Sequence, residues 1–124
     1  MIKILLVESQ LRIRQGLKMR LALETDIQVI GEASDSQSGM QLAFELNPNV
    51  VVMEVEWTVL DCFSAIQSLH GKMPEAKIIA LSLYDDETIR NLARLAGAAD
   101  FVAKSSGPQA LLSAIRQTVK QPVE

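Results

Sequence analysis

The sequence predicts an α/β domain in which a doubly wound, five-stranded parallel sheet, with strand order 2-1-3-4-5, is covered by helices on both faces. Short apolar runs that suit buried strands alternate with longer segments whose apolar residues recur at helical spacing. This alternation is typical of a parallel sheet, and right-handed crossovers then leave few topologies. The 124 residues suffice for one domain that buries roughly two-thirds of the surface its unfolded chain exposes.

The first third of the chain predicts a strand, a helix and a second strand. Residues 2–7 are apolar around one lysine and are followed at once by polar residues, which indicates a strand. Apolar residues recur at helical spacing over 13–24, and the short apolar run 27–31 predicts the second strand. Basic residues lie mainly on the other faces of this helix and are interpreted as a solvated surface: Arg12, Arg14, Lys18 and Arg20.

The next stretch predicts a helix and the central strand. Ser34 or Asp35 is expected to cap a helix that runs up to Pro48. Residues 49–54 then form a run with three valines, which is typical of a parallel strand buried on both faces. Glu54 stands at its carboxyl end, the edge at which ligands and chemistry collect in an open α/β sheet.

The second half of the chain continues the same alternation. Residues 61–71 predict a helix that a glycine closes, and 77–82 predict a strand that ends in a hydroxyl. Acidic residues open the helix expected over 85–97, where they suit the positive end of its dipole. A last strand is expected over 99–103, and a Gly-Pro pair begins the terminal helix, 107–119.

The polar residues at the carboxyl ends of the predicted strands should converge on one edge of the sheet. In chain order they are Glu8 with Ser9, Gly31, Glu54, Ser82 and Lys104. Two carboxylates, a hydroxyl and an ammonium could hold a divalent cation on oxygen ligands, or surround an anionic group. Any one of them alone could be a solvated residue where a strand meets a loop.

Composition limits the classes of partner. A net charge of −3 gives no electrostatic case for nucleic-acid binding by this domain. Cys62 is the lone cysteine, which excludes an internal disulfide and a multi-cysteine metal site and suits a reducing compartment. The apolar N-terminal run is too short for a signal peptide or membrane span, so we expect a cytoplasmic protein with no membrane partner.

These strands and their polar ends resemble the receiver domains of bacterial two-component response regulators, which have a CheY-like (flavodoxin-like) fold. Six stretches carry the resemblance in the same order along the chain, namely residues 4–10, 14–17, 29–34, 48–54, 81–87 and 96–104. They are most similar to the NarL/FixJ-like subgroup, in which the receiver precedes a LuxR-type DNA-binding domain. The resemblance implies one receiver domain over residues 1–124, with an output domain expected beyond it.

The resemblance also implies a role for each polar position. Glu54 stands where the family has the aspartate that accepts a phosphoryl group from a histidine kinase. Glu8 and Ser9 stand where the family has two acids that hold Mg²⁺ together with that aspartate. The remaining positions match the hydroxyl that contacts the phosphoryl group, the aromatic ring whose rotation reports activation, and the lysine after the fifth strand: Ser82, Phe101 and Lys104.

Three departures from the family pattern fall at this site. Glu54 is one methylene longer than aspartate, and misplacing a reacting atom by about 1 Å can slow a reaction on the order of a hundredfold. Ser9 replaces a carboxylate, so we expect only weak Mg²⁺ binding, by Glu8 and Glu54, and no required cofactor. The loop 57–62 lacks the glycines and the proline of the family. Trp57 is interpreted as shielding this loop, with a partner contact as the alternative, and Cys62 as a small residue at a helix start.

We therefore expect a phosphorylation-independent, non-enzymatic receiver that acts through a protein partner or a homodimer and reaches DNA only through an output domain. Glu54 would either reach Lys104 and Ser82 as a phosphoryl group does, or pair with Lys104 in a fixed interaction module. The alternatives are a conventional Mg²⁺-dependent phosphoacceptor that uses Glu54 and serves a cognate histidine kinase, and a stand-alone adaptor. A flavin enzyme is disfavoured because residues 8–11 have no glycine to cradle a phosphate.

Overall fold

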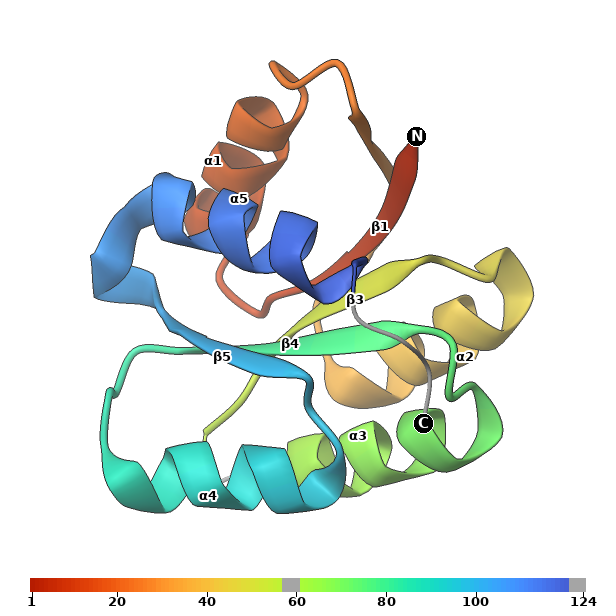
Figure 1. Cartoon of the computed structure of the whole chain (residues 1–124), viewed down its shortest axis with the longest axis vertical. Coiled ribbons are helices and arrows are strands. Elements are labelled where there is room, and N and C mark those ends of the chain that lie inside the picture. The colour runs from red at the N-terminus through yellow and green to blue at the C-terminus, as the bar shows by residue number, and fades with distance from the viewer. Residues whose placement is uncertain (57–60, 121–124) are drawn as a thin grey trace.

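The computed structural model describes residues 1–56 and 61–120, and these form a five-stranded parallel sheet between two layers of helices (Figure 1). The strands are β1 (Ile2–Val7), β2 (Ile27–Ala33), β3 (Val50–Glu54), β4 (Lys77–Ser82) and β5 (Asp100–Ala103). The helices are α1 (Leu11–Leu21), α2 (Ser36–Leu46), α3 (Asp61–Lys72), α4 (Glu87–Ala96) and α5 (Gly107–Thr118), and a 3-10 turn, η1 (Lys104–Ser106), precedes α5. The strand order β2-β1-β3-β4-β5 confirms the predicted topology.

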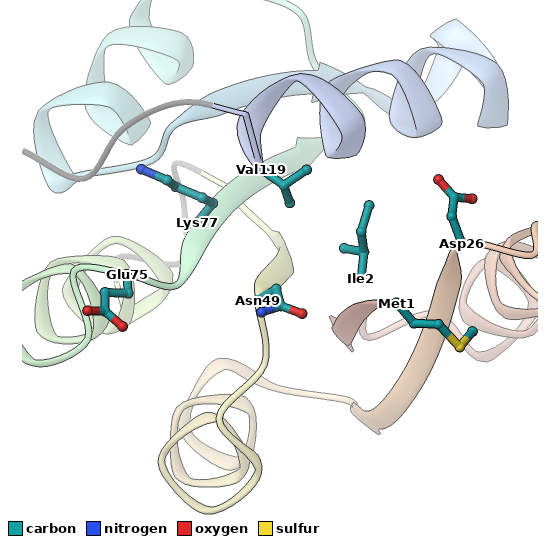
Figure 2. A pocket seen from close by; sticks show the side chains of 7 residues that line it. All are labelled: Met1, Ile2, Asp26, Asn49, Glu75, Lys77 and Val119. Atoms are coloured by element: carbon teal, nitrogen blue, oxygen red, sulfur yellow. The ribbon is translucent and has the colours of Figure 1, made fainter.

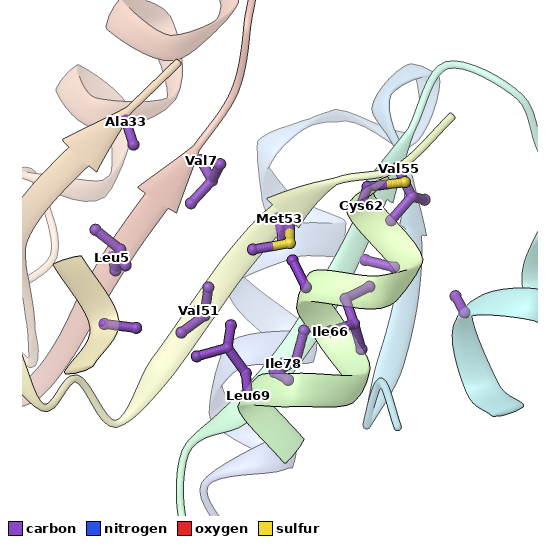
Figure 3. Packing of buried hydrophobic residues seen from close by; sticks show 14 of the residues in the cluster. Leu5, Val7, Ala33, Val51, Met53, Val55, Cys62, Ile66, Leu69 and Ile78 are labelled. Atoms are coloured by element: carbon purple, nitrogen blue, oxygen red, sulfur yellow. The ribbon is translucent and has the colours of Figure 1, made fainter. Parts of the chain in front are cut away.

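Successive side chains along each strand point to opposite faces of the sheet and contribute to two apolar cores. Leu5, Val51 and Met53 point to the face that α2, α3 and α4 cover, while Ile4 and Val52 point to the face that α1 and α5 cover. Figure 3 shows the first core, where the side chains of β3 meet those of α3. Every residue of the central strand before Glu54 is fully buried, which is why its sequence is a continuous apolar run.

Two helix starts follow from side-chain caps. The Asp35 carboxylate accepts a hydrogen bond from the Ser38 backbone N–H at 2.8 Å, so Asp35, of the two predicted candidates, caps α2. The Asp86 carboxylate likewise accepts from the Ile89 N–H at 2.8 Å and caps α4. Both caps set the direction in which the chain leaves the carboxyl edge of the sheet.

Some predicted boundaries are wrong. Gly31 does not end the second strand, because β2 continues to Ala33 and keeps its pairing with β1. A Cβ at Gly31 would lie 2.7 Å from Leu46 Cδ1, so this glycine allows α2 to approach the strand instead of marking the carboxyl edge. The first helix ends at Leu21 and not at residue 24, and the third continues through Gly71 to Lys72.

The basic residues of α1 are mostly neutralised by acids of neighbouring elements. Arg14 and Lys18 both pair with Glu32 of β2, at 2.9 and 2.7 Å, and Arg20 pairs with Glu24 at 2.8 Å. The prediction of a solvated face does not hold for Arg14, whose side chain is only 15% exposed because its guanidinium contacts Glu32. Within residues 1–56 and 61–120, no helix is long and apolar enough to cross a membrane.

Replacing Gly39 by alanine tests how closely α2 lies on β1. The added Cβ would lie 2.5 Å from Val7 Cγ2, and a strand valine has little rotamer freedom, so we expect the free energy of unfolding to fall by about 1–3 kcal/mol. Gly16→Ala in α1 is the matched control, since nothing beyond its own helix backbone lies within 4 Å of the new Cβ. Its higher helix propensity should add about 0.5–1 kcal/mol. Urea unfolding compares the three proteins, and equal stability of the two variants would contradict the packing described.

Candidate functional site

Three predicted residues meet at the carboxyl edge of the sheet. The Lys104 Nζ atom lies 2.6 Å from Glu8 Oε1 and 2.5 Å from Glu54 Oε2. Glu8 follows β1 and Glu54 ends the neighbouring strand β3, whereas Lys104 follows β5, so the lysine side chain extends across the end of β4 to reach both acids. The exposed fractions of the Glu8, Lys104 and Glu54 side chains are 0%, 7% and 13%, which makes this a buried ionic cluster.

Ser9 completes the partners of Glu54. Its hydroxyl donates a hydrogen bond to Glu54 Oε1 at 2.6 Å, and its backbone N–H donates to the same oxygen at 3.2 Å. Lys104 donates to the other oxygen, so both oxygens of Glu54 accept hydrogen bonds. An aspartate in place of Ser9 would face the Glu54 carboxylate with like charge and no side-chain donor.

Glu8 is held from two sides. Its Oε2 accepts a hydrogen bond from the Gln10 backbone N–H at 2.8 Å. Among the described residues Lys104 is the partner of its Oε1, which lies buried with no further donor. The Glu8 backbone carbonyl accepts from Arg14 Nη1 at 2.7 Å, so α1 also fixes the chain where β1 ends.

The two carboxylates share one ammonium, and their pKa values move apart. Burial raises the pKa of Glu8 above its usual value of 4.5, more than Lys104 and the Gln10 N–H lower it. Burial also acts to raise the pKa of Glu54, but hydrogen bonds from Lys104 and Ser9 outweigh it and lower that pKa. Burial opposes the Lys104 charge, yet its bonds to Glu54 and Glu8 raise the pKa of the ammonium. Glu54 and Lys104 are therefore a charged pair, and Glu8 is the acid that takes up a proton first.

Ser82, at the end of β4, and Phe101, in β5, do not join this cluster. The buried Ser82 hydroxyl oxygen accepts a hydrogen bond from the Tyr84 backbone N–H at 3.1 Å. Within the described part of the chain, no hydrogen bond links that hydroxyl to Glu54 or Lys104. Phe101 is half-buried in β5, and its ring faces the guanidinium of Arg90.

The residues present do not fit a Mg²⁺ ion. Residues 1–56 and 61–120 contain no group of three His, Cys, Asp or Glu side chains placed to hold a metal. The carboxylate oxygens of Glu8 and Glu54 already contact Lys104, Ser9 or the Gln10 N–H. A cation would have to displace the Lys104 ammonium, and Ser9 would offer it only a neutral ligand.

A hollow of about 260 Å³ opens beside Glu54, on the side of α2 and α3, with Ser9, Glu56, Asp61 and Cys62 in its wall. Cys62 is the second residue of α3, and burial raises the pKa of its thiol. This agrees with a small helix-start residue rather than a reactive thiol. Trp57 and the rest of the segment 57–60 lie outside the described residues, so the interpretation of that loop stays a prediction.

A second hollow, of about 460 Å³, lies at the opposite edge of the sheet, where the strands begin (Figure 2). Met1, Ile2, Asn49 and Lys77 stand in its wall, at the amino ends of β1, β3 and β4. It is separated from the buried cluster by the length of the strands and takes no part in that site.

Sequence reasoning missed two contributions to this region. It treated Ser9 as a lost metal ligand, whereas the serine is a hydrogen-bond donor to Glu54. It also passed over Arg90, whose contact with Phe101 joins residues on different elements and leaves no periodic pattern in the sequence. For the hydrogen bond from Ser9 to Glu54, the one signal in the sequence was the longer side chain of Glu54 together with a hydroxyl at residue 9.

The chain was compared with known proteins. Residues 4–116 match the response regulator receiver domain family. The transcriptional regulatory protein LiaR of Bacillus subtilis (strain 168) is 36% identical over 121 residues, which are 97% of this chain and 57% of LiaR. The chain spans about half the length of the curated relatives it matches.

Solved structures share the fold. The signal receiver domain of the putative response regulator NarL from Mycobacterium tuberculosis superposes with a TM-score of 0.89 over 98% of both chains, at 21% identity. A two-component response regulator of the LuxR family from Aurantimonas sp. SI85-9A1 gives a TM-score of 0.88 at 25% identity, over 95% of this chain and 84% of that chain. The predicted resemblance is confirmed: this chain belongs to the response regulator receiver domain family, and its relatives are response regulators of the LuxR and NarL type.

Proposed function

We propose that this chain is a receiver domain that signals through protein contacts without phosphorylation, as part of a regulator with a LuxR-type transcriptional output. One observation carries the proposal: Lys104 and Ser9 occupy both oxygens of Glu54, the residue at the position where the family accepts a phosphoryl group. A carboxylate that is to attack phosphorus needs an accessible oxygen and a cation to offset the incoming negative charge. Both oxygens of Glu54 already accept hydrogen bonds, and the surrounding residues do not provide a site for the cation.

Ser9 and Glu54 support this proposal as a complementary pair. The extra methylene of Glu54 brings its carboxylate to the Ser9 hydroxyl, and the hydroxyl provides a donor where an acid would repel. Ser9 and Glu54 thus stabilise each other. Glu8 remains as the second anion that keeps Lys104 in place.

Of the two states that Glu54 could favour, the contacts support a fixed module rather than a mimic of the phosphorylated state. A phosphoryl group carries close to two negative charges and three acceptor oxygens, whereas Glu54 carries one charge, which Lys104 offsets. The Ser82 hydroxyl binds the Tyr84 N–H of its own loop and is not drawn toward Glu54. Within residues 1–56 and 61–120, no hydrogen bond links the Ser82 hydroxyl to Glu54 to shift the β4–α4 loop.

The names of similar proteins support a transcriptional output for this receiver. LiaR is named a transcriptional regulatory protein, and the Aurantimonas structure is of the LuxR family. A DNA-binding domain that follows this receiver would then be controlled by its contacts with a protein partner or a second copy. We assign no catalytic residue and no required cofactor. If the open reading frame encodes no DNA-binding domain, the protein would instead be a stand-alone adaptor.

Phosphorylation by acetyl phosphate tests the proposal directly. The wild type should incorporate no phosphate with Mg²⁺ present, because the oxygens of Glu54 are engaged and the metal has no site. The double variant Ser9→Asp with Glu54→Asp restores the family's acids and should incorporate phosphate at least about a hundredfold faster. Intact-protein mass spectrometry measures the product, and each single variant is a control. Mg²⁺-dependent labelling of wild-type Glu54 at a rate within tenfold of the double variant would overturn the proposal.

The pH dependence of stability provides an independent check. The pKa of Glu54 is lowered from 4.5, so its pairing stabilises the fold above pH 4.5 and is lost as the pH falls through the folded-state value. The pKa of Glu8 is raised from 4.5, so its contribution is complete below that pH and is lost as the pH rises through the folded-state value.

Urea unfolding across pH separates the two acids. In Glu54→Gln, the free energy of unfolding should no longer show the part of its fall at acidic pH that Glu54 causes. In Glu8→Gln, it should no longer show the fall that occurs as the pH rises through the folded-state pKa of Glu8. If both variants followed the wild-type profile with a constant offset, the opposite pKa shifts of the two carboxyls would be wrong.

A further inference from the structure

A second cluster of charges lies away from the buried site, between α4 and β5. The Arg90 Nε atom donates a hydrogen bond to Asp85 Oδ1 at 2.6 Å. The guanidinium carbon of the same side chain lies 4.6 Å from the centroid of the Phe101 ring, within the range of a cation–π contact. One side chain of α4 therefore joins the loop before this helix to the strand β5.

The charges around Arg90 keep it in this position. The hydrogen bond to Asp85, with Asp100 nearby, raises the pKa of the guanidinium, and the same bond lowers the pKa of Asp85. Arg90 therefore stays charged throughout the physiological range. Its planar group can stack on a ring and bond a carboxylate at the same time, which a lysine ammonium does less well.

The Phe101 ring has space to move into if its contact with Arg90 is lost. The ring is half-buried and packs at the border of the core that α3 and α4 cover. A hollow of about 300 Å³ adjoins it, with Arg90, Arg94 and Asp100 also in the wall. Without the guanidinium, the ring has open space on its outer side.

We infer that Arg90 is the positioning residue for Phe101: its guanidinium holds the ring against the sheet and ties the β4–α4 loop to β5. The surface formed by α4 and β5 is thereby kept in one arrangement. This role is separate from the proposed function, because none of its contacts involves Glu54, Ser9 or Lys104. The contact between Arg90 and Phe101 would remain whether or not Glu54 accepts a phosphoryl group.

Fluorine NMR of the protein labelled with fluorophenylalanine reports the ring directly. The chain has three phenylalanines, and Phe101→Leu assigns the signal of Phe101. Arg90→Met removes both the charge and the cation–π contact, so the Phe101 signal should move or broaden, with the released ring roughly twofold to fivefold more populated, as a partly exposed cation–π contact implies. Asp85→Asn leaves the guanidinium but removes its anchor, and should give a smaller change in the same direction.

Arg94→Met is the matched control. Arg94 lies one turn further along α4, and its Nη2 atom donates to Asn91 Oδ1 at 3.3 Å. This variant should leave the Phe101 signal in place. The Phe44 ring, which the Lys72 ammonium faces at 5.5 Å, serves as an internal reference for the fold. An unchanged Phe101 signal in Arg90→Met, or an equal change in Arg94→Met, would overturn the inference, and Asp85→Asn decides it if Arg90→Met also disturbs Phe44.

Discussion

The structure depends on the Lys104 ammonium that lies between two buried carboxylates. Glu8 and Glu54 end neighbouring strands, so their charges would repel across the edge of the sheet if no cation reached them. Lys104, which directly follows β5, contacts both carboxylates and so ties the ends of β1, β3 and β5 together at this edge. Removing one partner from a buried ion pair costs about 3–5 kcal/mol, a large part of the stability of a small domain. The same contacts use the oxygens that a metal or a phosphoryl group would need.

The sequence was enough to predict the sheet order and the convergence of Glu8, Glu54 and Lys104, because parallel strands place their carboxyl ends together. It was not enough for Gly31, since the length of β2 follows from its pairing with β1 and from the approach of α2. Nor could it give the partner of the Ser82 hydroxyl, because a loop N–H and a carboxylate are equally plausible partners in a sequence. Contacts between side chains of different elements, such as that of Arg90 with Phe101, have no periodic signal at all.

The sheet thus carries two charged clusters, one buried and one partly exposed, and different interactions stabilise them. At the carboxyl edge, buried charges satisfy one another, and Ser9 and Glu54 complement each other there. On the α4 side, a partly exposed guanidinium orders a ring and a loop through contacts that solvent weakens. At the carboxyl edge Lys104 offsets the charge of Glu54, and under the proposed function the surface of α4 and β5 acts through binding partners.

The NMR signal of the Lys104 side-chain ammonium during a Mg²⁺ titration shows whether the two carboxylates stay with the lysine. A buried ammonium held by two carboxylates exchanges its protons slowly with water, and Lys104→Arg identifies its signal. We predict that the signal is observed near neutral pH and that millimolar Mg²⁺ leaves it unchanged, because the carboxylates stay with the lysine. A saturable shift or loss of the signal with Mg²⁺ would show that the metal displaces the lysine, and would contradict the closed Glu8–Lys104–Glu54 cluster.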